Sequence, residues 1–360
     1  MLENVPLAPY TTLGVGGSAR WFVETGDPAA MLAAVRFARQ QQVPFFILGG
    51  GSNLLVSDEG FAGVVIHVAS ARPIELHRQD AAATLIADAG VDWDFVVRLA
   101  VENNCAGIEC LAGIPGSVGG TPVQNVGAYG QEVSHTIASV HALDLEAEKF
   151  VTLSPAECGF SYRRSIFNTT HKGRYAITSV EYVLKLDLPP SLEYRDVKLY
   201  FAERGVALPT LSKTAEAVRS IRARKGMLLA EDDPDSRSAG SFFKNPIVPA
   251  AKIPGLAAIA DCHPDLVPRF PAGSDYSAGQ DMVKLSAAWL IELAGFHKGY
   301  HMGNAGLSTK HVLAIINRGG ATAAEIVALR DTIVNGVHAR IAIRLEQEPV
   351  LLGFMPMNLP

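Results

Sequence analysis

The chain has 360 residues, of which 48% are hydrophobic, with a formal net charge of −5 and a pI near 6.1. This length predicts two or three domains with enough apolar residues for a core in each. The small negative charge excludes a generally basic surface, so we expect neither nucleic acid nor an anionic membrane as a partner.

Cysteine usage and the apolar runs are typical of a soluble protein from a reducing compartment. The four cysteines, Cys105, Cys110, Cys158 and Cys262, form no CxxC pair and lack the spacing of a disulfide framework. The amino terminus shows no basic stretch followed by an apolar one, and no apolar run approaches a membrane span. We therefore expect a cytoplasmic protein, and nothing in the sequence requires more than a monomer.

The first part of the chain predicts a small α+β unit. Asp27 before Pro28 is typical of a helix start, and apolar residues at helical spacing continue to Gln42. Strand-forming runs surround this helix at 19–23, 44–48, 54–56 and 64–68.

A glycine triplet follows the strand expected at 44–48, in the run Gly49-Gly50-Gly51-Ser52-Asn53. A dinucleotide-binding turn would need glycine at Leu54 and a helix afterwards, whereas a strand is expected there, so the pattern disfavours a Rossmann turn. Successive amides can instead form an anion-binding concavity, with Ser52 and Asn53 as additional donors to a diphosphate. A turn with no ligand is the alternative.

The middle of the chain predicts a second α+β unit around a long glycine-rich stretch. Strands are expected at 82–89, 136–145 and 174–186, and an amphipathic helix at 93–103. Residues 110–131 contain six glycines and no charged side chain. Such a loop lets backbone amides approach a large polar ligand closely. A long structural loop is the alternative, although loops of this length inside compact domains tend to be functional.

Tyr162 and Arg163 form a polar pair between the two later strands of this unit. A guanidinium can clamp a carboxylate or phosphate with two hydrogen bonds. A surface salt bridge is the alternative reading.

The last third of the chain carries further polar groups. A helix at 215–225 holds several arginines, a pattern typical of a solvated face. In the run Gly240-Ser241-Phe242-Phe243-Lys244-Asn245, the serine is expected at the mouth of an apolar region. No Gly-x-Ser-x-Gly elbow surrounds it, so a hydrolase serine is not indicated. His297 and His301 are not expected to bind a metal, because no helical pattern aligns them.

Helices are expected at 281–294 and after the capping box formed by Thr322 and Glu325. From residue 341 an alternating pattern predicts a final strand, with Glu346 and Glu348 on its polar face.

The order of these motifs resembles that of the UDP-N-acetylenolpyruvoylglucosamine reductases over nearly the whole chain. The sharpest matches are 49–53, 113–116, 124–130, 162–163 and 240–246. The connection around Tyr194 resembles that of the type I members, which carry a tyrosine loop over the substrate.

This resemblance implies an α+β fold of three domains. Residues 1–69 and 70–211, with a C-terminal strand at 341–360, would form the two parts of a vanillyl-alcohol-oxidase-like FAD-binding fold. Residues 212–340 would form a substrate-binding α+β domain.

The resemblance also implies non-covalently bound FAD, NADPH as co-substrate and no metal. Amides and side chains from the two glycine-rich stretches would hold the FAD: Gly49, Gly50, Gly51, Ser52, Asn53, Gly116, Ser117, Gly119, Gly120, Gln124, Asn125, Gly127 and Tyr129.

Members of this family reduce the enolpyruvyl ether of UDP-N-acetylglucosamine enolpyruvate, giving UDP-N-acetylmuramate for peptidoglycan synthesis. The resemblance assigns Arg163 to the substrate carboxylate, where negative charge develops, and Ser241 to proton donation. Tyr194, Lys225 and Asn245 would hold the UDP diphosphate.

Glu348 would orient or polarise the same carboxylate, or supply a proton. The family's closing motif reads Leu-Glu-Pro-Glu-Val, whereas this chain has Leu345-Glu346-Gln347-Glu348-Pro349-Val350, which leaves Glu346 open for this role. Arg164 stands where an acidic residue often follows the Tyr-Arg pair, so the charge around Arg163 differs from the family pattern.

Two other functions stay open from the sequence. Another FAD-dependent oxidoreductase of the same fold, acting on an alcohol or sugar, would often bind FAD covalently through histidine or cysteine. A nucleotide-sugar-binding protein without redox activity would use the same basic and glycine-rich elements and would be colourless.

Overall fold

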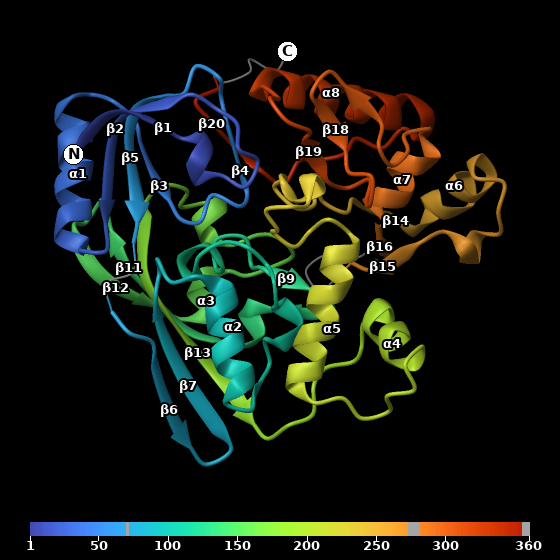
Figure 1. The fold of residues 1–360 in the computed structure, drawn as a ribbon, viewed down its shortest axis with the longest axis horizontal. Helices are drawn as coiled ribbons and strands as arrows, with labels where there is room; N and C mark the ends of the chain where they lie inside the picture. The colour runs from blue at the N-terminus through green and yellow to red at the C-terminus, as the bar shows by residue number, and fades with distance from the viewer. Residues whose placement is uncertain (70–71, 273–280, 355–360) are drawn as a thin grey trace. The chain divides into compact units, whose positions relative to one another are not determined.

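The computed structural model describes residues 1–69, 72–272 and 281–354, which form two compact units that alternate along the sequence (Figure 1). The first unit contains 1–6, 18–51 and 60–224, and the second contains 7–17, 52–59 and the described residues from 225 onward. Each unit has its own cluster of buried apolar side chains. No helix of the described ranges has both the length and the apolarity that crossing a bilayer requires. The division into three domains remains a prediction.

A four-stranded sheet of order β1-β2-β5-β3 forms one part of the first unit. Helix α1 packs on β2 and β5, and begins where Asp27 accepts a hydrogen bond of 3.0 Å from the amide of Ala29. The predicted helix start and strands are confirmed. The bounds are β1 Leu2–Pro6, β2 Ser18–Thr25, α1 Pro28–Gln40, β3 Phe45–Leu48 and β5 Phe61–Val68.

A six-stranded antiparallel sheet forms the rest of the first unit, in the order β12-β11-β13-β7-β6, with β8 also paired to β13. Helix α2 packs against both β8 and α5. The bounds are β6 Glu75–Gln79, β7 Ala82–Asp88, α2 Trp93–Glu102, β8 Cys105–Ala106, β9 Gly127–Ala128, β10 Gln131–Glu132, β11 Ile137–Asp144, β12 Lys149–Leu153, α3 Pro155–Cys158, β13 Tyr175–Leu186, α4 Arg195–Ala202 and α5 Leu211–Arg224.

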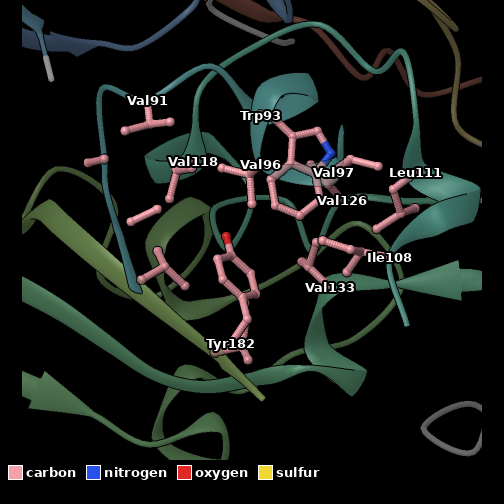
Figure 2. Packing of buried hydrophobic residues seen from close by; sticks show 14 of the residues in the cluster. Val91, Trp93, Val96, Val97, Ile108, Leu111, Val118, Val126, Val133 and Tyr182 are labelled. Atoms are coloured by element: carbon pink, nitrogen blue, oxygen red, sulfur yellow. The ribbon is translucent and has the colours of Figure 1, made fainter. Parts of the chain in front are cut away.

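Tyr182, on β13, joins this sheet to the glycine-rich stretch. Its ring is fully buried and lies 5.6 Å, between centroids, from that of Trp93 at the start of α2 (Figure 2). Its hydroxyl lies 2.7 Å from the Oγ1 of Thr121, and burial raises the pKa of Tyr182. Apolar residues of the loop, including Val118 and Val126, pack in the same cluster (Figure 2). The loop is therefore anchored on the sheet through both packing and a buried hydrogen bond.

Asp144, at the end of β11, should make the first unit sensitive to acid. The side chain is 2% exposed, and a hydrogen-bonded ion pair of 2.7 Å with Arg174 lowers its pKa to about 2. A carboxylate with a depressed folded-state pKa stabilises the fold above its unfolded pKa, and this contribution disappears as the pH falls from about 4 to about 2. At neutral pH we expect Asp144→Asn to lose about 2 kcal/mol of unfolding free energy. Urea unfolding between neutral and acid pH measures both effects, and equal losses at all pH values would contradict this assignment.

The second unit contains three small sheets and three α-helices among its described residues. The sheets have the orders β14-β16-β15, β17-β18-β19 and β20-β4, and α8 packs on β17, β18, β19 and α7. The bounds are β4 Leu54–Val56, β14 Ile247–Pro249, α6 Ile253–Ile259, β15 Arg269–Pro271, β16 Met282–Leu285, α7 Ala287–Leu293, β17 His301–Met302, β18 Ala305–Leu307, β19 Ile315–Asn317, α8 Ala323–Ile341 and β20 Val350–Leu352.

The capping box predicted for α8 is confirmed. The hydroxyl of Thr322 accepts from the amide of Glu325 at 3.1 Å, and the Glu325 carboxylate accepts from the amide of Thr322 at 2.9 Å. Asp58 adds a second cap, since its carboxylate accepts from the amides of Ala323 and Ala324 at 2.7 and 2.9 Å.

Two secondary-structure predictions in this unit are wrong. Residues 282–285 form β16, paired with β14 and β15, and the helix expected at 281–294 begins only after Ser286, which caps α7. The strand expected from 341 is also absent, because α8 extends to Ile341 and regular pairing resumes only at β20. Alternate residues from 341 to 345 are nevertheless buried, since this segment runs over the second core without a continuous ladder. Residues 355–360 of the expected strand lie outside the described ranges.

Candidate functional site

The glycine triplet packs backbone to backbone against the glycine-rich stretch within the first unit. A Cβ added at Gly50 would lie 2.7 Å from the Cα of Gly116, and one at Gly49 would lie 2.5 Å from the Oγ of Ser117. Gly51 and Gly116 have φ angles of +60° and +129°, which favour glycine. This approach needs residues without side chains, which explains the glycines that the sequence places there.

The start of the glycine-rich stretch is held by charged residues from α2 and α5. The Asp94 carboxylate accepts from the amide of Gly113 at 2.5 Å and forms two hydrogen bonds, of 2.5 and 2.6 Å, with Arg219. The Nε of Arg222 donates to the carbonyl of Gly113 at 3.0 Å. Arg222 is 8% exposed, so the prediction of a solvated basic face is wrong at this position. These contacts depend on the fold and have no local signal in the sequence.

Arg163 lies in a tight turn supported by the same stretch. Its φ is +57°, and Ser161 and Arg164 close the turn with backbone hydrogen bonds of 3.0 and 3.1 Å. The Nη2 of Arg163 donates to the carbonyl of Gly127 at 2.9 Å. Asn125, almost fully buried with a φ of +45°, donates to the carbonyl of Ser161 at 3.2 Å. The guanidinium therefore lies against the glycine-rich stretch, and Asn125 supports its turn.

The two tyrosines predicted to contact ligands meet each other in the first unit. The rings of Tyr129 and Tyr194 form an edge-to-face pair with centroids 5.3 Å apart. Burial raises the pKa of Tyr129 to about 12 and also raises that of Tyr194. Both phenols therefore stay protonated at neutral pH and can donate hydrogen bonds.

The remaining predicted FAD ligands of the stretch lie close by in the chain. The amides of Gly119 and Gly120 donate to the carbonyls of Ala89 and Ser117 at 2.8 and 2.9 Å. A Cβ added at Gly119 would lie 2.7 Å from that of Ala89, whereas one at Gly120 would meet nothing within 4 Å. Gln124 is partly buried in the turn that follows.

A short antiparallel contact in the second unit joins the segment that follows Ser241 to the segment that contains Glu348. The amide of Glu348 donates to the carbonyl of Phe242 at 2.9 Å, immediately after Ser241. Asn53 joins them, since its Nδ2 donates to the carbonyl of Glu348 at 3.3 Å. Phe242 and Phe243 are buried, so Ser241 does lie at the edge of an apolar cluster, and it is itself half-buried.

The two glutamates left open by the sequence have different surroundings. The Glu346 side chain is 74% exposed and forms an ion pair of 2.6 Å with Lys244. Glu348 is partly buried beside the backbone of Phe242. The two glutamates therefore differ in exposure, and Glu346 is held at the surface by Lys244.

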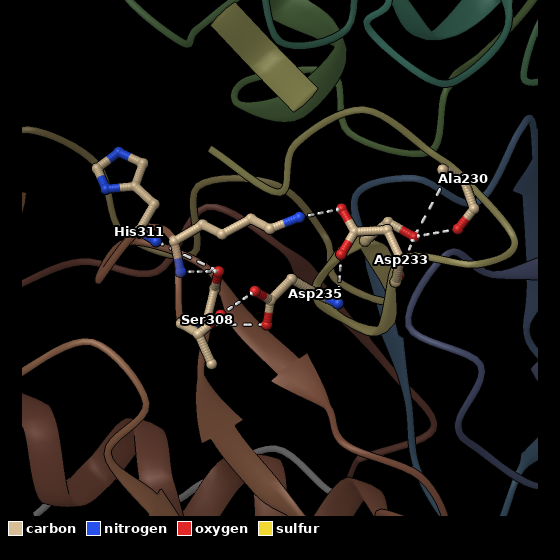
Figure 3. A network of polar contacts seen from close by, with 8 residues as sticks. Ala230, Asp233, Asp235, Ser308 and His311 are labelled. Carbon is tan, nitrogen blue, oxygen red and sulfur yellow. Dashed lines mark hydrogen bonds and ion pairs between the residues drawn. The ribbon is translucent and has the colours of Figure 1, made fainter. Parts of the chain in front are cut away.

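Lys225 begins the second unit next to a hydrogen-bonded acidic loop. A Cβ added at the following residue, Gly226, would lie 2.9 Å from the Cβ of Asp235, so the two segments are in close contact. Asp235 accepts from the amide and hydroxyl of Thr309 at 3.2 and 2.5 Å, and Lys310 pairs with Asp233 at 2.7 Å (Figure 3). This network holds the acidic loop at 233–235, against which Gly226 packs, and so holds the backbone next to Lys225.

Asn245 has a structural contact on one side of its amide group. Its Oδ1 accepts from the amide of Ala287 at 2.9 Å, at the start of α7. The side-chain nitrogen is thereby oriented away from that helix, as a donor.

Residues 19–154 match the family model for an FAD binding domain, and residues 232–352 match that for the UDP-N-acetylenolpyruvoylglucosamine reductase C-terminal domain. The UDP-N-acetylenolpyruvoylglucosamine reductase of Thermobifida fusca is 45% identical over 357 residues, covering 98% of each chain. The chain belongs to the UDP-N-acetylenolpyruvoylglucosamine reductase family. A second reductase of this name, from Nocardia farcinica, is 45% identical over 98% of this chain and 89% of its own.

A solved reductase of the family has the same fold. The crystal structure of UDP-N-acetylenolpyruvylglucosamine reductase from Thermus caldophilus aligns with a TM-score of 0.63 at 27% identity, covering 98% of this chain and 99% of that one. The resemblance seen in the sequence and the expectation of an α+β FAD-binding fold are confirmed.

The glycine-rich contact in the first unit fits a bound FAD. The Oγ of Ser117 is buried and has no hydrogen-bond partner among the described residues, although it lies beside Gly49 and Gly50. A diphosphate would accept a hydrogen bond from this hydroxyl, and the close contact of the two glycine-rich loops holds the hydroxyl in place.

Gly50→Ala should weaken FAD binding at least about 10-fold, because the new Cβ would overlap the Gly116 backbone and push the two loops apart. The flavin-to-protein absorbance ratio after gel filtration, and FAD titration of the apoprotein, measure this effect. Gly255→Ala, in α6, is the matched control because its Cβ meets nothing within 4 Å. Wild-type FAD affinity in Gly50→Ala would contradict a diphosphate site at the triplet.

Proposed function

We propose that the chain uses NADPH to reduce UDP-N-acetylglucosamine enolpyruvate to UDP-N-acetylmuramate in peptidoglycan synthesis. The observation that carries this proposal is the 45% identity to a reductase of that name over 98% of both chains. The two family models agree with it, one for FAD binding and one for the reductase C-terminal domain. The substrates are small molecules.

FAD, when bound, supplies the hydride chemistry that amino-acid side chains lack. We assign its diphosphate to Gly49, Gly50, Gly51, Ser52, Asn53, Gly116 and Ser117. The buried Ser117 hydroxyl and the close glycine contact support this assignment. Gly119, Gly120, Gln124, Asn125, Gly127 and Tyr129 would shape the rest of the site.

Arg163 would stabilise the negative charge that develops on the substrate carboxylate. Its turn is fixed by backbone hydrogen bonds and by Asn125, so the guanidinium is oriented before the reaction begins. Preorganised donors of this kind contribute strongly to catalysis because they need no reorientation in the transition state.

Ser241 would donate the proton to the carbon next to the carboxylate. Glu348 would polarise the same carboxylate or supply a proton, and the contact between residues 242 and 348 supports a shared task. Tyr194, Lys225 and Asn245 would hold the UDP diphosphate, with Lys225 as a point charge.

The direct test is a steady-state assay with NADPH and UDP-N-acetylglucosamine enolpyruvate, with the product analysed by mass spectrometry. We expect NADPH oxidation only when the enolpyruvate is present, with one UDP-N-acetylmuramate formed per NADPH. Oxidation of alcohols or sugars instead would indicate the other flavoenzyme reading, and a colourless protein that binds the sugar nucleotide would indicate the non-redox one.

We further infer a monomer in the cytoplasm. The four cysteines are free thiols, which suits a reducing compartment. Sedimentation of the FAD-loaded protein measures the oligomeric state, and a mass well above 38.3 kDa would contradict a monomer.

A further inference from the structure

The segment that carries Glu348 is held by a buried arginine of α8. Arg330 is 5% exposed, and its Nη1 donates to the side-chain carbonyl of Gln347 at 2.6 Å. The Nε2 of Gln347 in turn donates to the backbone carbonyl of Pro349 at 2.8 Å. Asp331 pairs with the same guanidinium at 2.8 Å. Burying a guanidinium is costly unless its donors are satisfied, and here they bind Asp331 and Gln347. Gln347 in turn binds Pro349, on the other side of Glu348.

The backbone around Gln347 would accept a proline at this position. Lys244 donates to the carbonyl of Glu346, and Glu348 donates to that of Phe242, each at 2.9 Å. Gln347 therefore faces Phe243 at the non-hydrogen-bonded position of this contact, where the residue's own N–H is not part of the pairing. Proline here would lose no pairing hydrogen bond.

We propose that Arg330 and Gln347 are positioning residues that fix the direction of Glu348. A proline ring would restrict the backbone before Glu348 by itself, whereas glutamine leaves that backbone free to rotate. In this chain the hydrogen bonds from Arg330 to Gln347 and from Gln347 to Pro349 supply the restriction instead. This inference rests on the proposed role of Glu348 beside Ser241.

The test compares Gln347→Ala with Gln347→Pro in the FAD-loaded protein. A misplaced catalytic group can cost up to about 100-fold in rate, so we expect Gln347→Ala to lower kcat about 10-fold or more. Reduction of the flavin by NADPH, which does not need Glu348 in this account, should keep its wild-type rate. Gln347→Pro should keep kcat within about twofold of wild type, because the proline ring restricts the backbone before Glu348 without the hydrogen bonds.

The arginine is tested by rescue. Arg330→Met should show the same selective loss of kcat, and adding Gln347→Pro to it should restore turnover, which would not happen if Arg330 merely stabilised α8. Arg340→Met, an exposed position on the same helix, is the control. Hydrogen exchange at the Glu348 amide gives a readout independent of activity. The exchange rate should be higher in Gln347→Ala and in Arg330→Met. It should be near that of the wild type in Gln347→Pro and in the double variant that combines Arg330→Met with Gln347→Pro.

The variants distinguish the positioning role of Arg330 and Gln347 from the role of Glu348 itself. Wild-type turnover in Gln347→Ala, or failure of Gln347→Pro to rescue Arg330→Met, would overturn the positioning role. If Glu348→Gln is inactive in the same assays, the proposed role of Glu348 still stands. Full activity of Glu348→Gln would instead reject the proposed role of Glu348, and the positioning inference with it.

Discussion

Ser241→Ala should lower turnover of UDP-N-acetylglucosamine enolpyruvate by about 10²–10⁴-fold, the range typical of a lost general acid. The serine immediately precedes the buried Phe242–Phe243 pair and is half-buried, so removing one hydroxyl changes little of the packing. Flavin reduction by NADPH should keep its wild-type rate, because no proton from Ser241 is needed for that half of the reaction. Stopped-flow absorbance of the two half-reactions separates these rates.

Ser212→Ala is the matched control for this variant. Ser212 is exposed on α5, and its hydroxyl donates a hydrogen bond of 3.4 Å to Glu216, one turn further along the same helix. It should leave both half-reactions unchanged. Normal turnover in Ser241→Ala would remove the serine from its assigned role, and slow flavin reduction would point to a general effect on the cofactor site.

Arg163→Met should lower kcat by about 10²–10³-fold, the cost typical of one preorganised donor at a developing anion. Methionine keeps the length of the side chain but removes its charge and hydrogen bonds, including the one to Gly127. The enolpyruvate KM should also rise, because the carboxylate loses a partner in the ground state as well. Steady-state kinetics with varied enolpyruvate measure both parameters.

Arg164→Met is the control for charge at this turn, because Arg164 is the exposed neighbour of Arg163. This variant removes one positive charge and should change kcat less than about twofold, since water and salt screen the charge of an exposed side chain. Equal losses in the two variants would show that net charge matters here, and not a directed contact.

Local sequence signals predicted most of the first unit correctly. The Asp27 cap, the helix from Trp93 and the long strands ending at Asp144 and Leu186 all lie within a few residues of their expected bounds. These elements have strong periodicity and capping residues next to them in the chain.

The errors in the second unit have a long-range cause. The apolar spacing of residues 282–285 predicts a helix, but these residues pair with β14 and β15, strands from other parts of the chain. From residue 341 to 345 the expected alternation of burial is present, but these residues belong to no described strand. The pairing that follows is an isolated bridge between Phe243 and Gln347. Burial periodicity alone cannot tell an extended segment from a strand.

The candidate site shows the same division. Glycines and a Tyr-Arg pair are visible in the sequence, since a close backbone approach and a guanidinium need those residue types. The residues that hold them are not visible: Asp94 and Arg222 anchor Gly113 from two distant helices, and Arg330 reaches Gln347 from α8. Such contacts exist only after the chain has folded.

In the proposed reaction, hydride equivalents pass from NADPH, by way of bound flavin, to the enolpyruvyl ether. The most direct measurement is anaerobic absorbance at the flavin band, first with one equivalent of NADPH and then with UDP-N-acetylglucosamine enolpyruvate. We expect bleaching by NADPH and rapid return of the oxidised spectrum when the enolpyruvate is added. Bleaching that persists after the enolpyruvate is added would contradict it.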